Sequence, residues 1–297
     1  MTALPLTAER LKAHPLPMPR AGSKDDRGSI LVLGGCAEVP GAVLLAGVAA
    51  LRAGAGKLKI ASVRSVAAAM AIAVPEAMVI GLPETESGAI DPEAGDRIVK
   101  AAERCDAVLL GPGMSTCGPT TDLVLSLLNA QPGTAYVLDA GAICGLDAHA
   151  PTVRALERHP ILTPHAGEMA QLLDWERDAV EAEPLKAARQ AADLLRAVVI
   201  MKGAESWIVA PDGECWHYRG GGVGLATSGS GDALAGIIAG ILARGVEPMR
   251  AALWGVFLHG EAGARLAASV GPLGFLAREI SGEVPALIHA VGADPSE

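Results

Sequence analysis

The sequence predicts an α/β protein with a central, mostly parallel sheet that is flanked by helices on both faces. Short apolar runs alternate with segments of helix-forming composition from residue 29 to about residue 201. The runs are apolar at nearly every position, which is typical of strands that are buried on both faces. A chain of 297 residues can also bury about three quarters of its unfolded surface, so it can form a large core.

The first strand and helix show how the pattern is assigned. The apolar run 29–33 ends at Gly34-Gly35, which predicts a buried strand followed by a tight turn. A helix is expected from Pro40 to Ala53, because proline is favoured at a helix start and glycine, here Gly54, just after its end. Runs of the same kind predict further strands at residues 57–61, 107–110, 135–138, 160–162 and 197–201.

The pattern changes after Lys202. Two short runs, 206–210 and 214–218, flank the turn sequence Pro211-Asp212-Gly213 and predict a β-hairpin. The chain beyond Gly231 is expected to be largely helical.

The chain is expected to form a single domain over residues 28–290, preceded by an N-terminal arm over residues 1–27. It contains no internal repeat and no low-complexity linker. Residues 176–196 are polar on one side, which predicts one amphipathic helix with a solvated face.

Composition argues against several classes of function. With 33 acidic residues against 24 Lys and Arg, the net charge of −9 disfavours nucleic acid as a partner. The apolar run 233–243 is far shorter than the ~20 residues of a membrane-spanning helix. No secretory signal is visible near the N-terminus. We therefore expect a cytoplasmic protein that binds neither nucleic acid nor a membrane.

The cysteines are odd in number and show no Cys-x-x-Cys spacing. This argues against a disulfide framework or a zinc site and favours reduced thiols, with an activated nucleophilic cysteine as the alternative. The five are Cys36, Cys105, Cys117, Cys144 and Cys215.

The segment 220–232 is the richest in chemistry. Its glycines let the backbone approach a ligand closely, and the helix expected from Gly231 points its free N–H groups at the loop. Such a loop suits phosphate. Asp232 would be repelled by phosphate, so its presence suggests a general base that deprotonates a hydroxyl attacking phosphorus. The alternative is that Asp232 is a helix N-cap and the glycines form a flexible loop.

Two common nucleotide motifs do not describe this chain. No Gly-Lys-[Ser/Thr] follows the loop, so it is not a Walker A loop. Gly34-Gly35 lacks the third glycine and the later acidic residue of a dinucleotide fingerprint, which weakens an oxidoreductase interpretation.

The loop Gly229-Ser230-Gly231-Asp232 resembles that of ribokinase-like enzymes. Further stretches, in the same order as in the family, make the chain similar to the ADP-dependent (S)-NAD(P)H-hydrate dehydratases over about residues 25–285. These stretches are Gly34-Gly35 with Pro40-Gly41-Ala42, Leu110-Gly111-Pro112-Gly113, Leu162-Thr163-Pro164-His165-Ala166-Gly167-Glu168 and Lys202-Gly203-Ala204-Glu205-Ser206.

The resemblance implies a reaction in which ADP drives the dehydration of hydrated NADH or NADPH, with release of AMP and phosphate. Hydroxide leaves C6 of the hydrated ring poorly, whereas phosphate leaves well, assisted by the lone pair of the ring nitrogen. Asp232 would activate the 6-hydroxyl, and the amides of Gly229, Ser230 and Gly231 would hold the transferred phosphoryl group.

The resemblance also assigns a second nucleotide-binding stretch, in which Lys202 would meet a phosphate; the alternative is an ordinary surface lysine. Ser206 stands where the family usually has threonine, and Ser228 where many members have glycine. Residues 219–222 also depart from the usual pattern, which affects the contacts expected with the adenosine. The implied stretch is Lys202, Gly203, Ala204, Glu205 and Ser206.

On the substrate side, the resemblance places His165, Ala42 and Gly113 against the hydrated cofactor, together with Asp232. The alternative for His165 is local packing at a helix start, and Glu168 is either an acid of that helix or a catalytic group. Asp139 follows a predicted strand and would hold Mg2+ directly or through water, unless it only caps the next segment.

The resemblance further implies a homo-oligomer, a tetramer by analogy, and cooperation with a separate NAD(P)H-hydrate epimerase. An alternative is a ribokinase-like kinase for a vitamin-precursor alcohol of the hydroxymethylpyrimidine or thiazole type, and a third is a non-enzymatic nucleotide sensor. His259 has no partner spacing and is interpreted as a core or interface histidine rather than a ligand, and Trp254 as core packing.

Overall fold

The computed structural model describes residues 2–18, 24–114 and 118–292, and a ten-stranded sheet forms its centre. The strands are β1 (Leu4–Pro5), β2 (Ser29–Leu33), β3 (Lys57–Val63), β4 (Ala77–Leu82), β5 (Ala107–Leu110), β6 (Ala135–Leu138), β7 (Ile161–Leu162), β8 (Val198–Met201), β9 (Ser206–Val209) and β10 (Cys215–Tyr218). Their order across the sheet is β1-β10-β9-β8-β7-β6-β5-β2-β3-β4.

The sheet is mostly parallel, as predicted. Within the described residues, only β9 runs antiparallel to its neighbours, β8 and β10; every other neighbouring pair is parallel. The β9–β10 pair is the predicted hairpin. All strands from β5 to β8 therefore bring their carboxyl ends to the same edge of the sheet, where ligands bind in open α/β folds.

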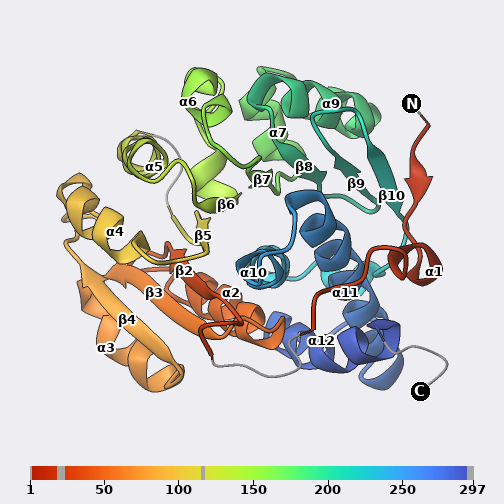
Figure 1. The fold of residues 1–297 in the computed structure, drawn as a ribbon, viewed down its shortest axis with the longest axis horizontal. Helices are drawn as coiled ribbons and strands as arrows, with labels where there is room; N and C mark the ends of the chain where they lie inside the picture. Colours follow the sequence, from red (N-terminus) through yellow and green to blue (C-terminus); the bar gives the residue numbers. More distant parts are fainter. Residues whose placement is uncertain (1, 19–23, 115–117, 293–297) are drawn as a thin grey trace.

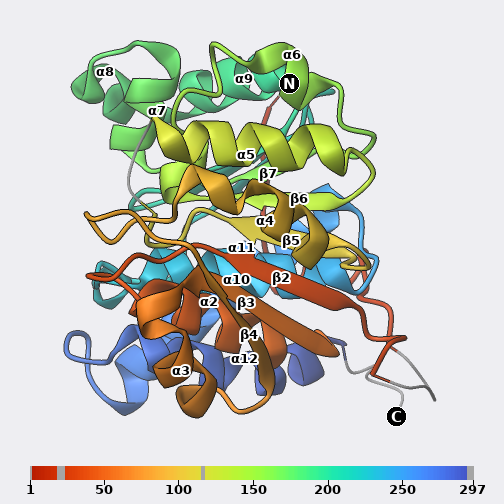
Figure 2. The same ribbon diagram turned by 90° about the vertical axis from the view of Figure 1, so that its left-hand side faces the viewer.

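Helices cover both faces of the sheet (Figures 1 and 2). They are α1 (Ala8–Leu11), α2 (Gly41–Arg52), α3 (Arg64–Ala73), α4 (Gly95–Ala102), α5 (Pro119–Ala130), α6 (Ala150–Arg154), α7 (Ala166–Leu173), α8 (Arg177–Ala182), α9 (Pro184–Leu195), α10 (Ser230–Ala243), α11 (Pro248–Ser269) and α12 (Ala277–Gly292). Short 3-10 turns lie at Pro92–Ala94, Ala140–Ile143 and Val223–Leu225.

Two apolar cores result, one on each face of the sheet. Along β2, Ile30 and Val32 contribute to the core beneath α2, α10, α11 and α12, whereas Leu31 and Leu33 contribute to the core beneath α4 to α9. Successive side chains of a strand point to opposite faces, so a strand buried on both must be apolar throughout. This explains the unbroken apolar runs in the sequence and confirms the predicted layer architecture.

Helix α10 lies at the centre of the fold, close against α2 (Figure 1). A Cβ on Gly236 would approach the carbonyl oxygen of Ala46 to 2.1 Å, and one on Gly240 that of Ala50 to 2.4 Å. Only glycine at these positions permits this close packing. The N-terminus of α10 is thereby fixed against the rest of the domain.

Three local expectations need correction. Residues 176–196 form two helices, α8 and α9, because a residue before proline disfavours helical backbone and the chain breaks at Glu183 before Pro184. The strand β4 was not anticipated. The helix expected from Gly231 begins one residue earlier, at Ser230.

The described part of the N-terminal arm belongs to the same core rather than standing apart from it. Strand β1 pairs in parallel with β10, and Leu11 in α1 is completely buried. Trp254, predicted to be in the core, donates from its indole nitrogen to the carbonyl of His14 over 2.7 Å. The arm therefore extends the sheet by one strand and is tied to α11.

The cysteines agree only in part with the expected reduced thiols. Cys36, Cys105 and Cys215 are free, but Cys144 is disulfide-bonded, so the expectation is wrong for that residue. Cys117 lies outside the described residues.

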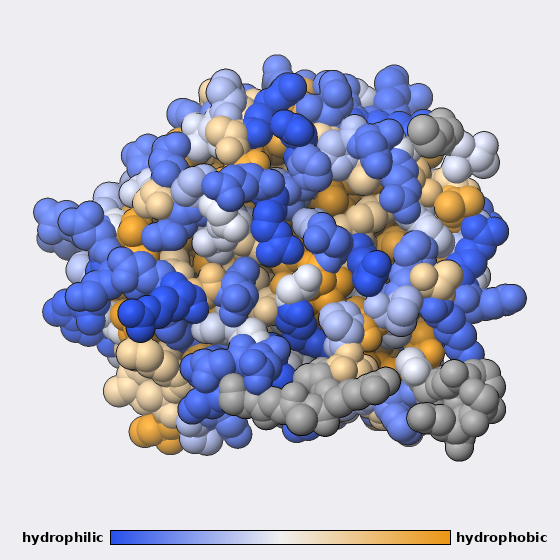
Figure 3. All heavy atoms as spheres, in the orientation of Figure 1, coloured by the Kyte–Doolittle hydropathy of each residue, from blue (hydrophilic) through white to orange (hydrophobic). Residues whose placement is uncertain are grey.

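Among the described helices, none is long and apolar enough to span a bilayer. The face viewed in Figure 1 is covered mostly by hydrophilic residues, with apolar residues visible near its centre (Figure 3).

Candidate active site

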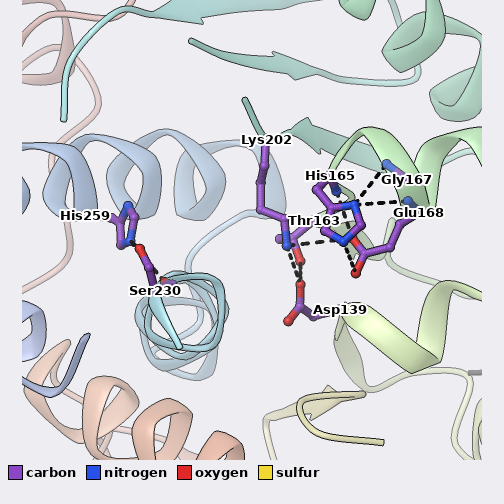
Figure 4. Close-up of polar contacts among 8 residues, drawn as sticks. All are labelled: Asp139, Thr163, His165, Gly167, Glu168, Lys202, Ser230 and His259. Carbon is purple, nitrogen blue, oxygen red and sulfur yellow. Dashed lines mark hydrogen bonds and ion pairs between the residues drawn. The ribbon is translucent and has the colours of Figure 1, made fainter. Parts of the chain in front are cut away.

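Polar side chains gather where three adjacent parallel strands end. Asp139 follows β6, Thr163 and His165 follow β7, and Lys202 follows β8. Figure 4 shows Lys202 pointing toward Asp139, with His165 and Glu168 on one side and the start of α10 on the other. Segments more than sixty residues apart in sequence thus meet at one edge of the sheet, as predicted from their positions at strand ends.

Asp139 and Lys202 form the centre of this cluster. The carboxylate of Asp139 is buried, and its Oδ1 accepts hydrogen bonds from Thr163 Oγ1 at 2.5 Å and from Lys202 Nζ at 2.9 Å. Glu168 Oε2 lies 3.9 Å from the same ammonium. Burial lowers the pKa of Lys202, but attraction to Asp139, Glu168 and Asp232 outweighs it and leaves the pKa above its usual value. Lys202 is a permanently charged, partly enclosed cation rather than an ordinary surface lysine.

Asp232 stands in the first turn of α10 within the field of this cluster. Burial, assisted by repulsion from Asp139 and Glu168 and opposed by attraction to Lys202, raises the pKa of Asp232 from 3.8 to about 6. A carboxylate with that pKa is ionised at neutral pH and is a stronger base than an ordinary aspartate. The alternative role as an N-cap is wrong, because Gly229 is the N-cap residue and Asp232 lies inside the helix.

The glycines of the loop have different tasks. Gly229 has a φ of +88°, and a Cβ there would approach Leu45 Cδ1 to 2.4 Å, so the backbone conformation itself requires glycine. A Cβ on Gly231 would lie 3.5 Å from Lys202 Nζ, in ordinary contact. Gly231 therefore faces the ammonium, and its absent side chain leaves space beside that charge.

The N-terminus of α10 offers backbone donors to a ligand. No side chain in the described residues caps this helix. The N–H of Ser230 donates to Thr227 O at 3.2 Å. The next two residues, Gly231 and Asp232, lie in the first turn of the helix, where a backbone N–H has no acceptor within the helix itself. Of the predicted amide donors, Ser230 is thus already engaged, and Gly231 is well placed.

His165 begins α7 and closes a capping box. Its Nδ1 accepts from the N–H groups of Gly167 and Glu168 at 3.0 and 3.1 Å, and Glu168 Oε2 accepts from the His165 N–H at 2.8 Å. The side chain is 60% exposed. On the other edge of the ring, Nε2 lies 3.4 Å from Glu168 Oε1. The imidazole therefore caps the helix and contacts Glu168, while its exposed part remains accessible to a ligand, so both interpretations of the sequence are compatible with one geometry. Glu168 is confirmed as an acid of the first helical turn.

The two small residues predicted on the substrate side lie against each other. A Cβ on Gly113, which has a φ of +67°, would approach Ala42 Cβ to 2.9 Å. Gly35 N–H donates to Pro112 O at 2.7 Å, which joins the two loops. Beside them is a narrow surface crevice. Its lining comprises Gly35, Cys36, Ala89, Ile90, Met114 and Thr120.

The rest of the predicted nucleotide stretch turns away from Lys202. Gly203, Ala204 and Glu205 are exposed. Glu205 pairs with His217 at 2.7 Å and with Arg219 at 3.3 Å, and Ser206 begins β9. Any contact of this stretch with a nucleotide therefore comes from its exposed turn rather than from the buried cluster.

His259 is the residue whose contact the sequence did not reveal. It lies in α11, partly buried, and its Nε2 is 2.9 Å from Ser230 Oγ and 3.1 Å from Ser230 O (Figure 4). Burial lowers the pKa of His259 to about 4, so the imidazole is neutral. The predicted core position is confirmed in part, but its partner is the first residue of α10. No spacing in the sequence links residues 230 and 259.

The fold and the cluster together define a ribokinase-like enzyme, with Asp232 and the uncapped start of α10 beside Lys202 at the carboxyl edge of the sheet. The ADP/ATP-dependent NAD(P)H-hydrate dehydratase of Bacillus subtilis, crystallised with ATP and Mg2+, matches with a TM-score of 0.82 and 28% identity, over 98% of this chain and 99% of that one.

The sequence model of the NAD(P)H-hydrate dehydratases matches residues 30–286, and the chain belongs to this family. The ADP-dependent (S)-NAD(P)H-hydrate dehydratase of Xanthomonas campestris is 52% identical over 285 residues, 95% of each chain. The bifunctional NAD(P)H-hydrate repair enzyme of Moorella thermoacetica is 37% identical over 269 residues, which cover 91% of this chain but 51% of that enzyme.

Proposed function

We propose that this protein catalyses the ADP-dependent dehydration of the S epimer of hydrated NADH and NADPH, regenerating the reduced cofactor with release of AMP and phosphate. Family membership supports the reaction. The observation that carries it is the position of Asp232, a base with a pKa of about 6, in the helix turn that also presents Gly231 to Lys202. This arrangement brings a base and an anion site to the same place.

The first step is a phosphoryl transfer. Asp232 takes the proton of the 6-hydroxyl as its oxygen attacks the β-phosphorus of ADP, and the bond from that phosphorus to the bridging oxygen breaks, releasing AMP. Lys202 and the first-turn N–H groups of α10 stabilise the charge that develops on the transferred group. Asp139 and Thr163 hold Lys202 in place for this task.

The second step is an elimination. The C6–O bond breaks, phosphate leaves, and the ring-nitrogen lone pair forms an iminium ion. Loss of the proton from C5 then restores the dihydronicotinamide. The chain's contribution here is electrostatic, because Lys202 and the α10 N-terminus favour the departing phosphate.

We further propose that the site is divided between the two ligands. Lys202, the exposed turn 203–206 and the start of α10 form the side of the nucleotide. Ala42 and Gly113, with their small side chains, and the exposed edge of His165 form the side of the hydrated cofactor. We assign the small residues this role because their mutual contact leaves a shallow wall where a dihydropyridine ring can approach.

Magnesium is a separate question, because Asp139 was expected to hold it. Oδ1 of Asp139 already accepts hydrogen bonds from Thr163 and Lys202. Within the described ranges, no group of three His, Cys, Asp or Glu side chains is arranged to hold a metal ion. The residues do not fit a magnesium ion held by the protein alone. Mg2+ would therefore be bound chiefly by the phosphates of the nucleotide.

The proposal is tested by incubating the protein with hydrated NADH in the presence of ADP, of ATP or of neither. Recovery of the near-ultraviolet absorbance of the dihydronicotinamide, with AMP as the nucleotide product from ADP, is the expected result. A protein that leaves hydrated NADH unchanged but phosphorylates a pyrimidine or thiazole alcohol from ATP would be the alternative kinase instead.

Three further properties remain proposals. The bifunctional relative joins a matching segment to additional sequence, which supports functional coupling of this chain to an NAD(P)H-hydrate epimerase. A homotetramer and a cytoplasmic location follow from the resemblance and from composition. Size-exclusion chromatography with light scattering tests the homotetramer. A rate increase on adding epimerase to a mixture of both epimers tests the functional coupling.

A further inference from the structure

The peptide unit between Ser230 and Gly231 joins two features of the site. Its carbonyl belongs to Ser230 and lies 3.1 Å from His259 Nε2. Its N–H belongs to Gly231, the residue that faces Lys202. Because a peptide unit is planar and its C=O and N–H point in opposite directions, whatever fixes the carbonyl also aims the N–H.

The contact to the carbonyl determines the role of the imidazole. A carbonyl oxygen can only accept, so Nε2 carries the proton and donates to Ser230 O, with Ser230 Oγ at 2.9 Å as a second acceptor. Gly229 O is the first acceptor of α10 and takes the Ala233 N–H at 3.0 Å, so Ser230 O is the second acceptor by helix geometry. His259 adds a second donor from a different helix, and it ties α11 to the turn that binds the phosphoryl group.

We propose that His259 is a positioning residue: it fixes the Ser230–Gly231 peptide plane and thereby aims the Gly231 N–H at the phosphoryl group of ADP. The proposal rests on the function proposed above, and it adds a residue outside the cluster around Lys202. Burial suits this role, because a histidine that stays neutral keeps its Nε2 proton without placing a second positive charge beside Lys202.

This role predicts how variants of His259 should rank by turnover. His259→Leu keeps an apolar body but loses the donor, and we expect turnover to fall by about 10- to 100-fold, less than the loss of a whole oxyanion donor. His259→Gln can place an amide N–H near the position of Nε2 and should stay within about threefold of wild type, whereas His259→Asn is too short and should resemble the leucine variant.

A spectroscopic measurement separates aiming from a loss of stability. In protein labelled with ¹⁵N-glycine, the Gly231 amide of wild type should shift downfield on addition of ADP, and this shift should be lost in His259→Leu and kept in His259→Gln. Leu258→Ala, a fully buried neighbour in α11, is the control: it should lower the melting temperature while keeping both the shift and the turnover.

The outcomes distinguish this inference from the proposed function. If the wild-type Gly231 amide does not respond to ADP, the nucleotide site and this inference fall together. If wild type responds and turns over hydrated NADH, and His259→Leu does both equally well, only the positioning role is overturned. A glutamine variant that folds but is as impaired as the leucine variant would overturn it as well.

Discussion

Lys202 and Asp139 form a 2.9 Å ion pair across the end of the sheet, and the strand β7 lies between the two strands that they follow. Their side chains are only 18% and 3% exposed. A buried pair of this kind is costly to break, because the remaining charge has neither water nor a partner. Thr163, from the intervening strand, completes the contact by donating to the same oxygen.

Lys202→Met should therefore destabilise the protein by roughly 3–5 kcal/mol, since it leaves the Asp139 carboxylate buried and unpaired. Adding Asp139→Asn should recover a large part of that loss, although neither variant should bind ADP as wild type does. Urea unfolding followed by circular dichroism measures both. Lys57→Met removes the cation of the exposed Lys57–Asp25 pair and is the matched control, with an expected change of about 0–1 kcal/mol. A small change for Lys202→Met would contradict the energetic role of the pair.

The pH dependence of the reaction should report Asp232. Its pKa is raised to about 6 by burial and by Asp139, and only the ionised form accepts a proton. We expect kcat/KM to be constant at neutral pH and to fall below pH about 6. In Asp139→Asn the repelling charge is absent, so the descending limb should move to lower pH. A limb that stays in place in Asp139→Asn, or that follows the ordinary carboxyl value in wild type, would show that another group controls the rate.

Asp232→Asn should lose activity and gain stability. Turnover should fall by about 10²- to 10⁴-fold, the usual range for a positioned general base. The folded-state pKa lies above the unfolded value of 3.8, so ionised Asp232 costs stability above pH about 6, and this cost disappears below pH about 4.

We expect Asp232→Asn to unfold with a free energy roughly 1–3 kcal/mol above wild type at pH 8, with the difference shrinking as the pH is lowered toward 4. Denaturant titrations at pH 8 and pH 4 measure it. Wild-type turnover in the folded variant would remove Asp232 from the mechanism, and equal stability at pH 8 would contradict its burial as an ionised group.

The two loop glycines should separate structure from binding. Gly229→Ala forces a side chain into the left-handed region and toward Leu45, so it should lower the melting temperature by several degrees. Gly231→Ala meets only Lys202 Nζ at ordinary distance and should fold normally, yet its methyl group fills the space where a phosphate must approach.

Titration calorimetry with ADP and a thermal melt of each variant test this contrast. Gly245→Ala is a useful control, because Gly245 also has a positive φ of +82° but lies in the exposed turn after α10, at the opposite end of that helix from Gly229. Unchanged ADP affinity in Gly231→Ala would mean that the phosphate does not sit beside this residue.

The sheet could be predicted from the sequence because strands buried on both faces must be apolar throughout, and Asp232 was singled out as the candidate base because it directly follows the glycine-rich loop. Features that depend on tertiary contacts were missed. β4 has an apolar run of its own, residues 77–80, but Gly81 interrupts the run, and the strand lies at the edge of the sheet with Met78 exposed. His259 looks like one more residue of an apolar helix until α11 folds back on Ser230. The break between α8 and α9 could have been predicted from Pro184, because a proline disfavours helical backbone in the residue before it.

The last prediction concerns His165, which serves a helix and is expected to serve a ligand too. His165→Ala removes the acceptor for the Gly167 and Glu168 N–H groups and should cost about 0.5–2 kcal/mol of stability in addition to any binding effect. His165→Asn keeps a good N-cap and removes the far edge of the ring together with the 3.4 Å contact between Nε2 and Glu168 Oε1. It therefore isolates the contribution of the imidazole to ligand binding.

If that edge contacts the hydrated cofactor, His165→Asn should weaken binding of NAD(P)H, a stable substitute for the hydrate, by about 5- to 150-fold, which corresponds to one lost hydrogen bond of roughly 1–3 kcal/mol. ADP affinity should change far less, because the proposed phosphate site is formed by Lys202 and Gly231 and not by His165. Separate calorimetric titrations with each ligand decide the matter. A loss of ADP binding with unchanged dinucleotide binding would move His165 to the nucleotide side and leave Ala42 and Gly113 as the only residues assigned to the substrate alone.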